Sequence, residues 1–228
     1  MLTVSDISKS FNTLPVLEHI TFHVNHDEIV AVIGPSGCGK STLLNIISGL
    51  CTADQGFISG ADNAIACVFQ DDRLLPWRTV WENISLVGDT EEPDRIHELI
   101  NAVGLKGFEN YYPGQLSGGM KKRCGIARAF YYRSGLLLLD EPFQGLDYCL
   151  RREMLQMLLR VWKEHKQSVL FVTHEIDEAL TAASRIIVLS DRPGKIAQEF
   201  DLPEKEGRNP ISSGLNKIRQ EIIKRITS

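Results

Sequence analysis

The chain has 228 residues, of which 43% are hydrophobic and 24% are charged, and its formal net charge is −4. These values are typical of a globular domain with a sizeable core, and they disfavour a nucleic-acid binder, which usually has a basic surplus. No apolar run reaches the roughly 18–20 residues that a membrane-spanning helix needs, and we see no secretory signal. The five scattered cysteines form no CxxC pair, so we expect free thiols and a cytoplasmic location.

We predict strands over the first thirty residues of the chain. Ile20, Phe22 and Val24 alternate with polar residues, which is the period of a half-buried strand. Residues 29–33 are apolar at every position, as expected of a central strand that is covered on both faces. A helix is predicted over residues 41–48, followed by loops and short strands up to residue 69.

A change of character begins near residue 71 and predicts a helical insertion that is not part of the sheet. Trp77 and Trp81 lie in a segment rich in leucine and proline. Further on, apolar residues with the spacing i, i+3, i+4 and i+7 follow Pro93 and Asp94, and they predict a capped amphipathic helix. These apolar residues are Ile96, Leu99, Ile100 and Val103.

Strands and helices alternate in the rest of the chain. We predict helices over about 118–132 and along a segment that contains Met154 and Leu158, and strands at 136–139, 168–173, 185–190 and 195–201. The residues between the last two strands, Asp191 to Gly194, are typical of a turn. A final amphipathic helix is predicted from Leu215, Ile218, Ile222, Ile223 and Ile226. This alternation favours an α/β fold with a mainly parallel sheet.

The glycine-rich segment after the buried strand predicts a phosphate-binding loop. Residues 34–42 match G-x-x-x-x-G-K-[ST] in full, with a buried strand before them and a helix after them. Glycines let backbone N–H groups face phosphate oxygens, and the helix start adds a favourable dipole. Lys40 is expected to reach the β- and γ-phosphates, and Ser41 offers a hydroxyl ligand to Mg²⁺. The nucleotide-binding residues of this loop are Gly34, Pro35, Ser36, Gly37, Cys38, Gly39, Lys40, Ser41 and Thr42.

Two acidic residues end the apolar strand predicted at 136–139. Asp140 would hold the water shell of a Mg²⁺ ion beside the nucleotide. Glu141 projects differently and is a candidate general base for an attacking water. The alternative for Glu141 is that it only caps the segment ahead of Pro142.

A second glycine pair stands behind a serine. Ser117 is a good helix N-cap, and Gly118 and Gly119 leave backbone N–H groups bare at the helix start, which makes a second anion site. A purely structural cap is the alternative. The sequence order LSGGM, the arginines that follow it and the Asp140–Glu141 pair downstream favour the anion site.

With these motifs the chain resembles the nucleotide-binding subunits of ABC transporters over roughly residues 2–200. The resemblance implies a P-loop NTPase fold, an ABC-type nucleotide-binding domain with an antiparallel β subdomain and a helical subdomain. It also implies one domain over residues 1–228, with the helical subdomain at about 71–134 inserted in a RecA-like core. The cofactors that it implies are ATP and Mg²⁺, and the activity is ATP hydrolysis.

The resemblance also suggests roles for residues outside the phosphate loop. Gln70 is similar to the Q-loop glutamine, which contacts the metal and the attacking water, so the implied metal-binding set is Ser41, Gln70 and Asp140. His174 resembles the switch histidine, which makes Glu141, His174 and Gln70 the implied catalytic residues; a satisfied histidine at a strand end is the alternative. Phe11 looks like the A-loop aromatic that stacks on adenine, and Asp147 like the D-loop aspartate.

The family arrangement accounts for the second glycine pair. Two cassettes pair head to tail, so that Ser117, Gly118 and Gly119 of each bind the γ-phosphate held by the other. The implied partner is therefore a second cassette, with a homodimer expected. Three departures from the family pattern are Met120 at the end of LSGGM, Gln144-Gly145 before the D-loop, and Phe11 in place of tyrosine; none removes a hydrolytic residue.

The segment from Gln70 to Trp77 is similar to the Q-loop of importers for nitrate, sulfonates, taurine and related small organic solutes. We therefore expect an ATP-hydrolysing subunit that powers solute import through a separate membrane permease docked near residues 70–81, and an extracytoplasmic solute-binding protein acting indirectly. The expected location is cytoplasmic, peripheral on the inner face of the membrane, with no nucleic-acid partner. For Leu74, Leu75 and Trp77 the alternative is a place in the core of the helical subdomain.

Two other functions are alternatives to this one. A soluble ABC ATPase of DNA repair or translation should show a long coiled-coil insertion or two fused cassettes, and neither fits in 228 residues. A small-molecule P-loop kinase would not need the LSGGM segment or His174. The transported solute stays open, because specificity lies in other subunits.

Overall fold

The structure is a computed structural model, and it describes residues 1–60, 64–203 and 213–227. The strands are β1 (Leu2–Phe11), β2 (Leu14–Val24), β3 (Ile29–Ile33), β4 (Gln55–Ser59), β5 (Ile65–Val68), β6 (Leu136–Asp140), β7 (Ser168–Thr173), β8 (Arg185–Leu189) and β9 (Ile196–Asp201). The helices are α1 (Lys40–Ile47), α2 (Val80–Ser85), α3 (Pro93–Ala102), α4 (Gly118–Tyr131), α5 (Tyr148–His165), α6 (Ile176–Ala182) and α7 (Ser213–Thr227), with a 3-10 turn at Pro113–Gln115. The predicted elements differ from these by a residue or so at their ends.

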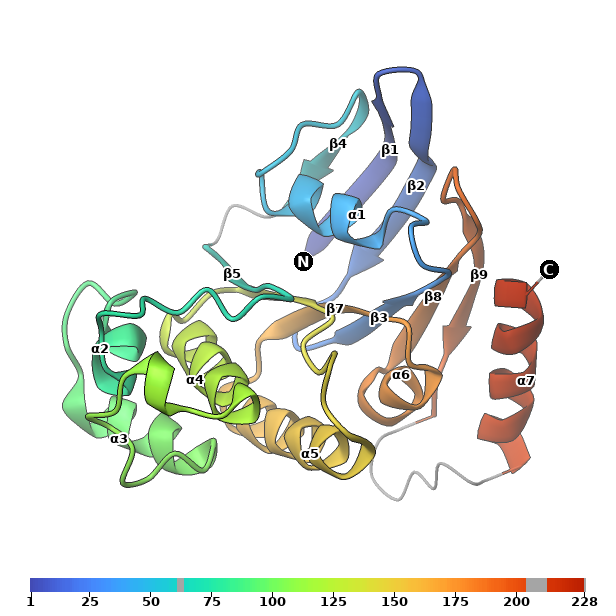
Figure 1. Ribbon diagram of the computed structural model, residues 1–228. Coiled ribbons are helices and arrows are strands. Elements are labelled where there is room, and N and C mark those ends of the chain that lie inside the picture. Colours follow the sequence, from blue (N-terminus) through green and yellow to red (C-terminus); the bar gives the residue numbers. More distant parts are fainter. Residues whose placement is uncertain (61–63, 204–212, 228) are drawn as a thin grey trace.

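The larger sheet lies at the centre of the molecule, with strand order β5-β6-β7-β3-β8-β9 in the described residues (Figure 1). All neighbours are parallel except β8 and β9. The unbroken apolar run of β3 is explained by its two covered faces. Ile29, Ala31 and Ile33 point into a core with α4, α5 and α6, whereas Val30 and Val32 point into a second core with α1 and the smaller sheet. The mainly parallel sheet predicted from the sequence is confirmed.

The smaller sheet, with order β2-β1-β4, is antiparallel and stands above α1 in Figure 1. Ile20, Phe22 and Val24 of β2 are buried, and the polar residues between them are exposed, as the alternation predicts. This sheet confirms the antiparallel β subdomain. It matters for function because β2 lies against the loop that precedes α1, as described below.

Helices α2, α3 and α4 form the lobe on the left of Figure 1. Thr79 and Glu82 close a capping box at the start of α2. The predicted cap of α3 is wrong, because its N-cap Glu92 makes no side-chain capping bond and Pro93 alone marks the helix start. The limits of this lobe at residues 71 and 134 stay a prediction.

The residues before α2 are divided between the two interpretations of this segment. The side chain of Trp77 is 68% exposed, so Trp77 does not belong to the core of the lobe, whereas Leu74 is partly buried against that core.

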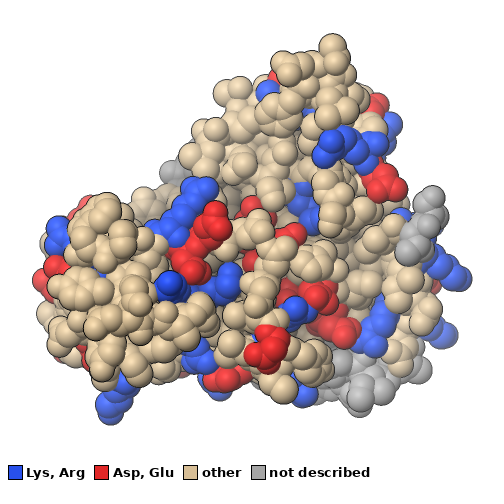
Figure 2. Space-filling view, viewed as in Figure 1, with Lys and Arg blue, Asp and Glu red and all other residues tan. Residues whose placement is uncertain are grey.

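On the face shown in Figure 2, basic and acidic side chains are interspersed in the hollow between the lobe and the rest of the molecule. Among the described residues, none of the helices is long and apolar enough to cross a membrane.

The last helix, α7, covers the outer strands on the right of Figure 1. Leu215 and Ile222 are buried, and Ile218 and Ile226 are partly buried against the same core, as the predicted amphipathic pattern requires. Ile223 differs from the prediction, since 38% of its surface is exposed.

An ion-pair network around buried Arg185 stabilises the edge of the sheet opposite to the loops that follow β3, β6 and β7. Arg185, at the start of β8, donates from Nε to Glu28 at 3.0 Å and from Nη1 to Glu199 at 2.9 Å, and it also bonds the His23 carbonyl. Burial by itself would raise the pKa of Glu28, but hydrogen bonds from Arg185 and from the Asn25 N–H outweigh burial and lower that pKa.

Arg185→Met is expected to lower the free energy of unfolding by about 1–3 kcal/mol, because it leaves the partly buried Glu28 carboxylate without a cation. Since the folded-state pKa of Glu28 is depressed, its stabilisation is present above the unfolded pKa of about 4.5 and is lost as the pH falls through the folded value. Urea unfolding between pH 3 and 7 measures both effects, with exposed Arg152→Met as the control. Adding Glu28→Gln to Arg185→Met should restore part of the loss; no recovery would contradict this explanation.

Candidate functional site

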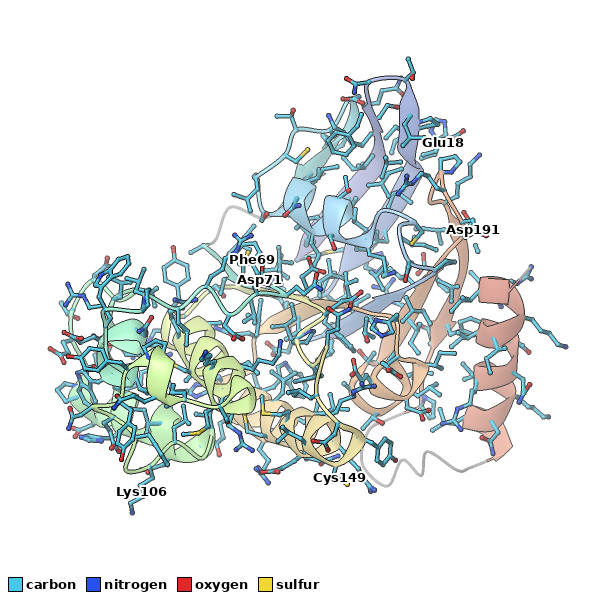
Figure 3. The ribbon with its side chains drawn as sticks, in the orientation of Figure 1. Glu18, Phe69, Asp71, Lys106, Cys149 and Asp191 are labelled. Carbon is cyan, nitrogen blue, oxygen red and sulfur yellow. The ribbon has the colours of Figure 1, made fainter. Side chains whose placement is uncertain are left out.

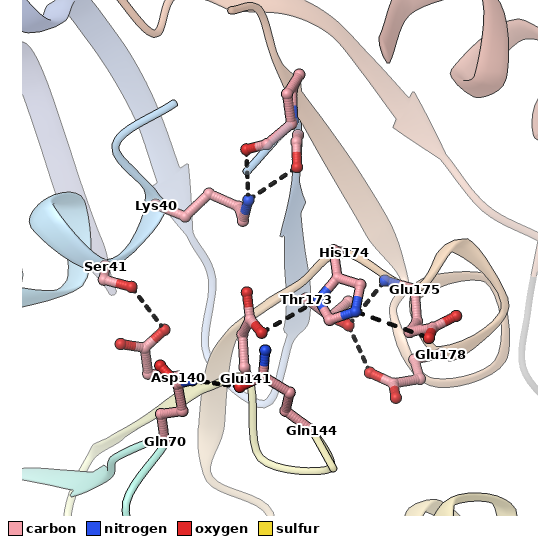
Figure 4. Close-up of polar contacts among 12 residues, drawn as sticks. Lys40, Ser41, Gln70, Asp140, Glu141, Gln144, Thr173, His174, Glu175 and Glu178 are labelled. Carbon is pink, nitrogen blue, oxygen red and sulfur yellow. Dashed lines mark hydrogen bonds and ion pairs between the residues drawn. The ribbon is translucent and has the colours of Figure 1, made fainter. Parts of the chain in front are cut away.

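Three neighbouring strands of the large sheet end at the same edge, and each one is followed by a predicted site residue. In the order β6-β7-β3, these strands are followed by Glu141, His174 and the glycine loop. Carboxyl ends of parallel strands are the usual position of ligand sites in open α/β sheets. Figure 4 shows the side chains that meet there.

The glycine loop has the geometry that phosphate binding needs. Gly37 and Gly39 have φ angles of 79° and 110°, in the region that favours glycine. A Cβ atom on Gly39 would also lie 2.7 Å from Leu17 of β2, so close packing demands glycine at this position as well. Lys40 opens α1, and its buried ammonium group donates to the carbonyls of Gly34 and Pro35, each at 2.8 Å. The ammonium group of Lys40 is therefore held against the loop at the start of a helix, where an anion is favoured.

Ser41 and Asp140 come together from α1 and the end of β6. The Ser41 hydroxyl donates to the Asp140 carboxylate at 3.1 Å across 99 residues of sequence. Burial raises the pKa of Asp140, and the nearby Glu141 adds to the rise, whereas the Ser41 hydrogen bond and the charge of Lys40 oppose it. The two side chains place a hydroxyl and a carboxylate oxygen side by side, the kind of donor that Mg²⁺ accepts.

Glu141 and His174 form the next pair along this edge. His174 Nδ1 lies 3.1 Å from Glu141 Oε2, and the Glu141 side chain is 17% exposed. The backbone of Glu141 has a φ of 45°, a left-handed conformation that costs about 1–3 kcal/mol in a non-glycine residue. Its N–H bonds the Val172 carbonyl of β7 at 3.0 Å, which holds the turn in place. Such strain occurs at functional sites, but Arg133 and Lys166 have similar φ values where helices α4 and α5 end, so the site role of Glu141 stays a prediction.

His174 is held from the other side by the residues around it. The Thr173 hydroxyl donates to buried Glu178 at 2.6 Å and accepts from the Glu175 N–H at 3.0 Å. Arg151 of α5 forms an ion pair with Glu175, and His174 Nε2 lies 3.8 Å from the same carboxylate. The histidine therefore stands between two carboxylates on a braced turn, as Figure 4 shows.

Gln70 reaches the same edge from the segment after β5. Its amide donates to the side chain of Gln144, which follows Glu141 in the next turn. Helix α4 holds this segment by its carbonyls, because Lys122 donates to Gln70 at 3.3 Å and Arg128 donates to Arg73 at 3.0 Å. Figure 3 labels Phe69 and Asp71 in this segment, above α4. The helix that begins with the second glycine pair thus also positions Gln70.

A pocket of about 420 Å³ lies at this edge. The predicted residues in its wall are Phe11, Ser36, Gly37, Gly39, Lys40, Ser41, Thr42, Gln70 and Glu141. Phe11, at the end of β1, is 49% exposed and can offer a ring face to a base. Four more wall residues were not predicted as site residues: Leu14, Val16, Gln144 and Arg192. Gln144 could have been found from its position three residues after Glu141 in the sequence. No sequence motif around Arg192 indicates a site residue.

The second glycine pair and Asp147 are not part of the pocket wall. Ser117 accepts from the Met120 N–H at 3.3 Å and caps α4, with Gly118 and Gly119 in its first turn. Asp147 caps α5 by accepting from the Leu150 N–H at 3.0 Å. Within a single chain, Ser117 therefore acts as a structural cap of α4. An anion-binding role would need a nucleotide that is held by another chain.

A larger hollow of about 870 Å³ lies at the opposite edge of the sheet. Its wall includes Asp27, Gly135 and Ser168, which stand at the amino ends of β3, β6 and β7. It has side chains of both charges and none of the predicted site residues in its wall.

Comparisons with known proteins show which family the chain is similar to. The profile of the ABC transporter family matches residues 17–144. The chain is 40% identical over 238 residues to the aliphatic sulfonates import ATP-binding protein SsuB of Bacillus cereus, with 97% of this chain and 94% of that protein covered. It is 41% identical over 215 residues to the taurine import ATP-binding protein TauB of Yersinia pestis bv. Antiqua, covering 89% and 84%.

Solved structures show the same similarity in three dimensions. One is an ATP-binding subunit of an ABC transporter, with a TM-score of 0.79, 26% identity and coverage of 98% of this chain and 99% of the other. Another is a dimeric, post-hydrolysis ATP-binding cassette bound to ADP and Pi, with a TM-score of 0.77, 29% identity and coverage of 90% and 100%. The similarity thus extends far beyond the glycine loop.

Proposed function

The chain belongs to the ABC transporter family, and from this membership we propose that it is the ATP-hydrolysing subunit of an importer for small sulfonate-like solutes. It is an ATP-binding protein and an ATPase, like the family members that are named import ATP-binding proteins. The observation that carries this function is the meeting of the glycine loop, the Ser41–Asp140 pair and the Glu141–His174 pair at the ends of three adjacent strands.

The residues of the site suggest a division of labour. Lys40 and the loop N–H groups would bind the phosphates, and Phe11 would stack on the base. Ser41 and Asp140 fit Mg²⁺, because this ion prefers one or two protein oxygens together with substrate phosphates. The bound ion would neutralise charge on the phosphates. Glu141 would take the proton of the attacking water, with His174 holding the carboxylate in place and Gln70 reaching toward the same water.

A second cassette would complete this site, with a homodimer expected. Ser117, Gly118 and Gly119 lie outside the pocket of their own chain, although they present N–H groups at the start of a 14-residue helix. A head-to-tail pair would bring these groups of one chain to the γ-phosphate held by the other. Asp147, at the start of α5, would lie near the junction of the two chains.

The membrane partner would be a permease that docks near residues 70–81. Exposed Trp77 supports this position, since a large apolar side chain at 68% exposure beside the Gln70 segment offers a contact surface. The chain would then be held at the inner face of the membrane, and an extracytoplasmic binding protein would act on it only through the permease. The names of the relatives favour sulfonates or taurine over nitrate as the cargo.

Reconstitution with its permease and binding protein in vesicles tests the proposal. We expect ATP hydrolysis to rise severalfold when an alkanesulfonate or taurine loads the binding protein, with release of phosphate and no phosphorylated acceptor. Lys40→Ala should abolish this response. ATP hydrolysis that is indifferent to the permease would indicate a non-transport ATPase, and a phosphorylated product would indicate a kinase.

A further inference from the structure

Arg192 joins the glycine loop to a distant turn. It lies between β8 and β9, and its guanidinium donates from Nε and Nη2 to the Gly37 carbonyl at 2.9 and 2.6 Å, across 155 residues of sequence. Its side chain also belongs to the wall of the 420 Å³ pocket. Hydrogen bonds from a charged donor are stronger than those between neutral groups, and here one guanidinium makes two of them to the same carbonyl oxygen.

The carbonyls of a phosphate-binding loop need partners of their own. Because the N–H groups must face the phosphates, the carbonyls face elsewhere and have to be satisfied there. Lys40 donates to the carbonyls of Gly34 and Pro35, and the Leu43 N–H of α1 bonds Gly39. In the described part of the chain, the Gly37 carbonyl bonds to Arg192, which comes from outside the loop and its helix.

The direction of one carbonyl sets the direction of the next N–H. In a trans peptide unit the C=O and N–H point to opposite sides, so a fixed Gly37 carbonyl also fixes the Cys38 N–H. That N–H donates to the Pro35 carbonyl at 3.3 Å, on the inside of the loop. Gly37 itself has a φ of 79° and the freedom of glycine, and the peptide unit that follows it is bonded at both ends, to Pro35 inside the loop and to Arg192 outside it.

The turn that carries Arg192 is itself anchored firmly. The Ser190 hydroxyl accepts from the Lys195 N–H at 3.0 Å, and the Ser190 N–H bonds the Lys195 carbonyl at 2.9 Å. Gly194 is bonded to β2 on both sides, donating to Val16 at 2.9 Å and accepting from Glu18 at 3.0 Å. Figure 3 shows Glu18 and Asp191 on the same side of the molecule.

Gly194 also packs directly against the glycine loop. A Cβ atom added there would lie 2.3 Å from the Cys38 carbonyl oxygen, which leaves no room for any larger residue. The turn, β2 and the loop therefore form one tightly packed unit, and Arg192 is presented to Gly37 from a fixed base.

We propose that Arg192 is a positioning residue for the nucleotide phosphates, acting through the Gly37 carbonyl and adding a positive charge to the pocket wall. This role rests on the proposed ATP-binding function. It predicts that loss of the guanidinium weakens nucleotide binding more than it slows the chemical step, because Glu141 and His174 are untouched.

The test compares Arg192→Gln, Arg192→Lys and the wild type. For the full chain, equilibrium dialysis with ATP should give a Kd about tenfold higher for Arg192→Gln, as expected for the loss of hydrogen bonds to a charged group. In the assembled transporter, KM for ATP should rise by a similar factor while kcat changes little. Arg192→Lys keeps the charge but not the forked geometry, so it should recover part of the affinity.

Lys195→Gln is the matched control, since Lys195 lies in the same turn but pairs with Glu18 at 3.1 Å, away from the loop. Its Kd for ATP should equal that of the wild type. If Arg192→Gln binds ATP as well as the wild type does, or if it loses no more than Lys195→Gln, the role of Arg192 is wrong. If the wild-type chain itself binds no ATP, the proposed function fails, and the role of Arg192 fails with it.

Discussion

Glu141→Gln is expected to lower ATP turnover by about 100–1,000-fold while the Kd for ATP stays close to that of the wild type. The substitution keeps the size of the side chain and an oxygen that can contact His174 Nδ1, which lies 3.1 Å from the carboxylate in the wild type. It removes only the basic oxygen that would accept a proton from water. A loss of kcat without a loss of binding therefore separates the chemical role of Glu141 from a structural one.

Glu178→Gln is the matched control for this experiment. Glu178 is a buried carboxylate near His174, but it accepts from the Thr173 hydroxyl and lies outside the pocket. A glutamine there can still accept that hydrogen bond, so turnover should change far less than in Glu141→Gln. Near wild-type turnover by Glu141→Gln, with phosphate release as the readout, would show that another group is the general base.

Ser117→Arg is expected to abolish ATP hydrolysis although Ser117 lies outside the pocket of its own chain. A long cation at the start of α4 would block the contact with a nucleotide held by a second chain. Loss of the helix cap, which costs about 1 kcal/mol, is too small to explain such an effect. Ser117→Thr keeps both the hydroxyl and the cap, so it should retain most of the activity.

A mixing experiment gives this prediction a sharper form. Chains with Ser117→Arg and chains with Lys40→Ala should each be inactive alone. A mixed dimer has one composite site built from the intact loop of the first chain and the intact Ser117 of the second. Random pairing should therefore restore up to about a quarter of wild-type turnover. If Ser117→Arg is active alone, or if the mixture recovers nothing, the composite site is wrong.

The strand and helix pattern was predictable because it depends on local periodicity. Residues 29–33 are apolar throughout, and the structure divides them between two cores, as a strand covered on both faces requires. The glycine loop was predictable for a related reason. Its residues are consecutive, and the strand before it and the helix after it are also readable from consecutive residues.

Contacts between distant segments were not predictable in this way. Ser41 meets Asp140 across 99 residues, and Gln70 meets Gln144 across 74. The resemblance to a family suggested roles for three of these residues, but no spacing in the chain indicated that Gln144 would accept from Gln70. Trp77 and Leu74 are both large apolar residues in the same segment. Trp77 is exposed and Leu74 is partly buried, since burial depends on which elements pack around each side chain.

The sequence alone determined the α/β class, the phosphate loop, the acidic end of β6 and the second glycine pair, because each is written in a short run of residues with its own steric or electrostatic demand. Only the tertiary structure decided that Arg192 holds the phosphate loop and that α4 holds the Gln70 segment. The Arg192 contact depends on β3 and β8 being neighbours in the large sheet, which brings the loop before α1 close to the β8–β9 turn. Local pattern thus specified the parts of the site, and the sheet topology specified what keeps those parts in position.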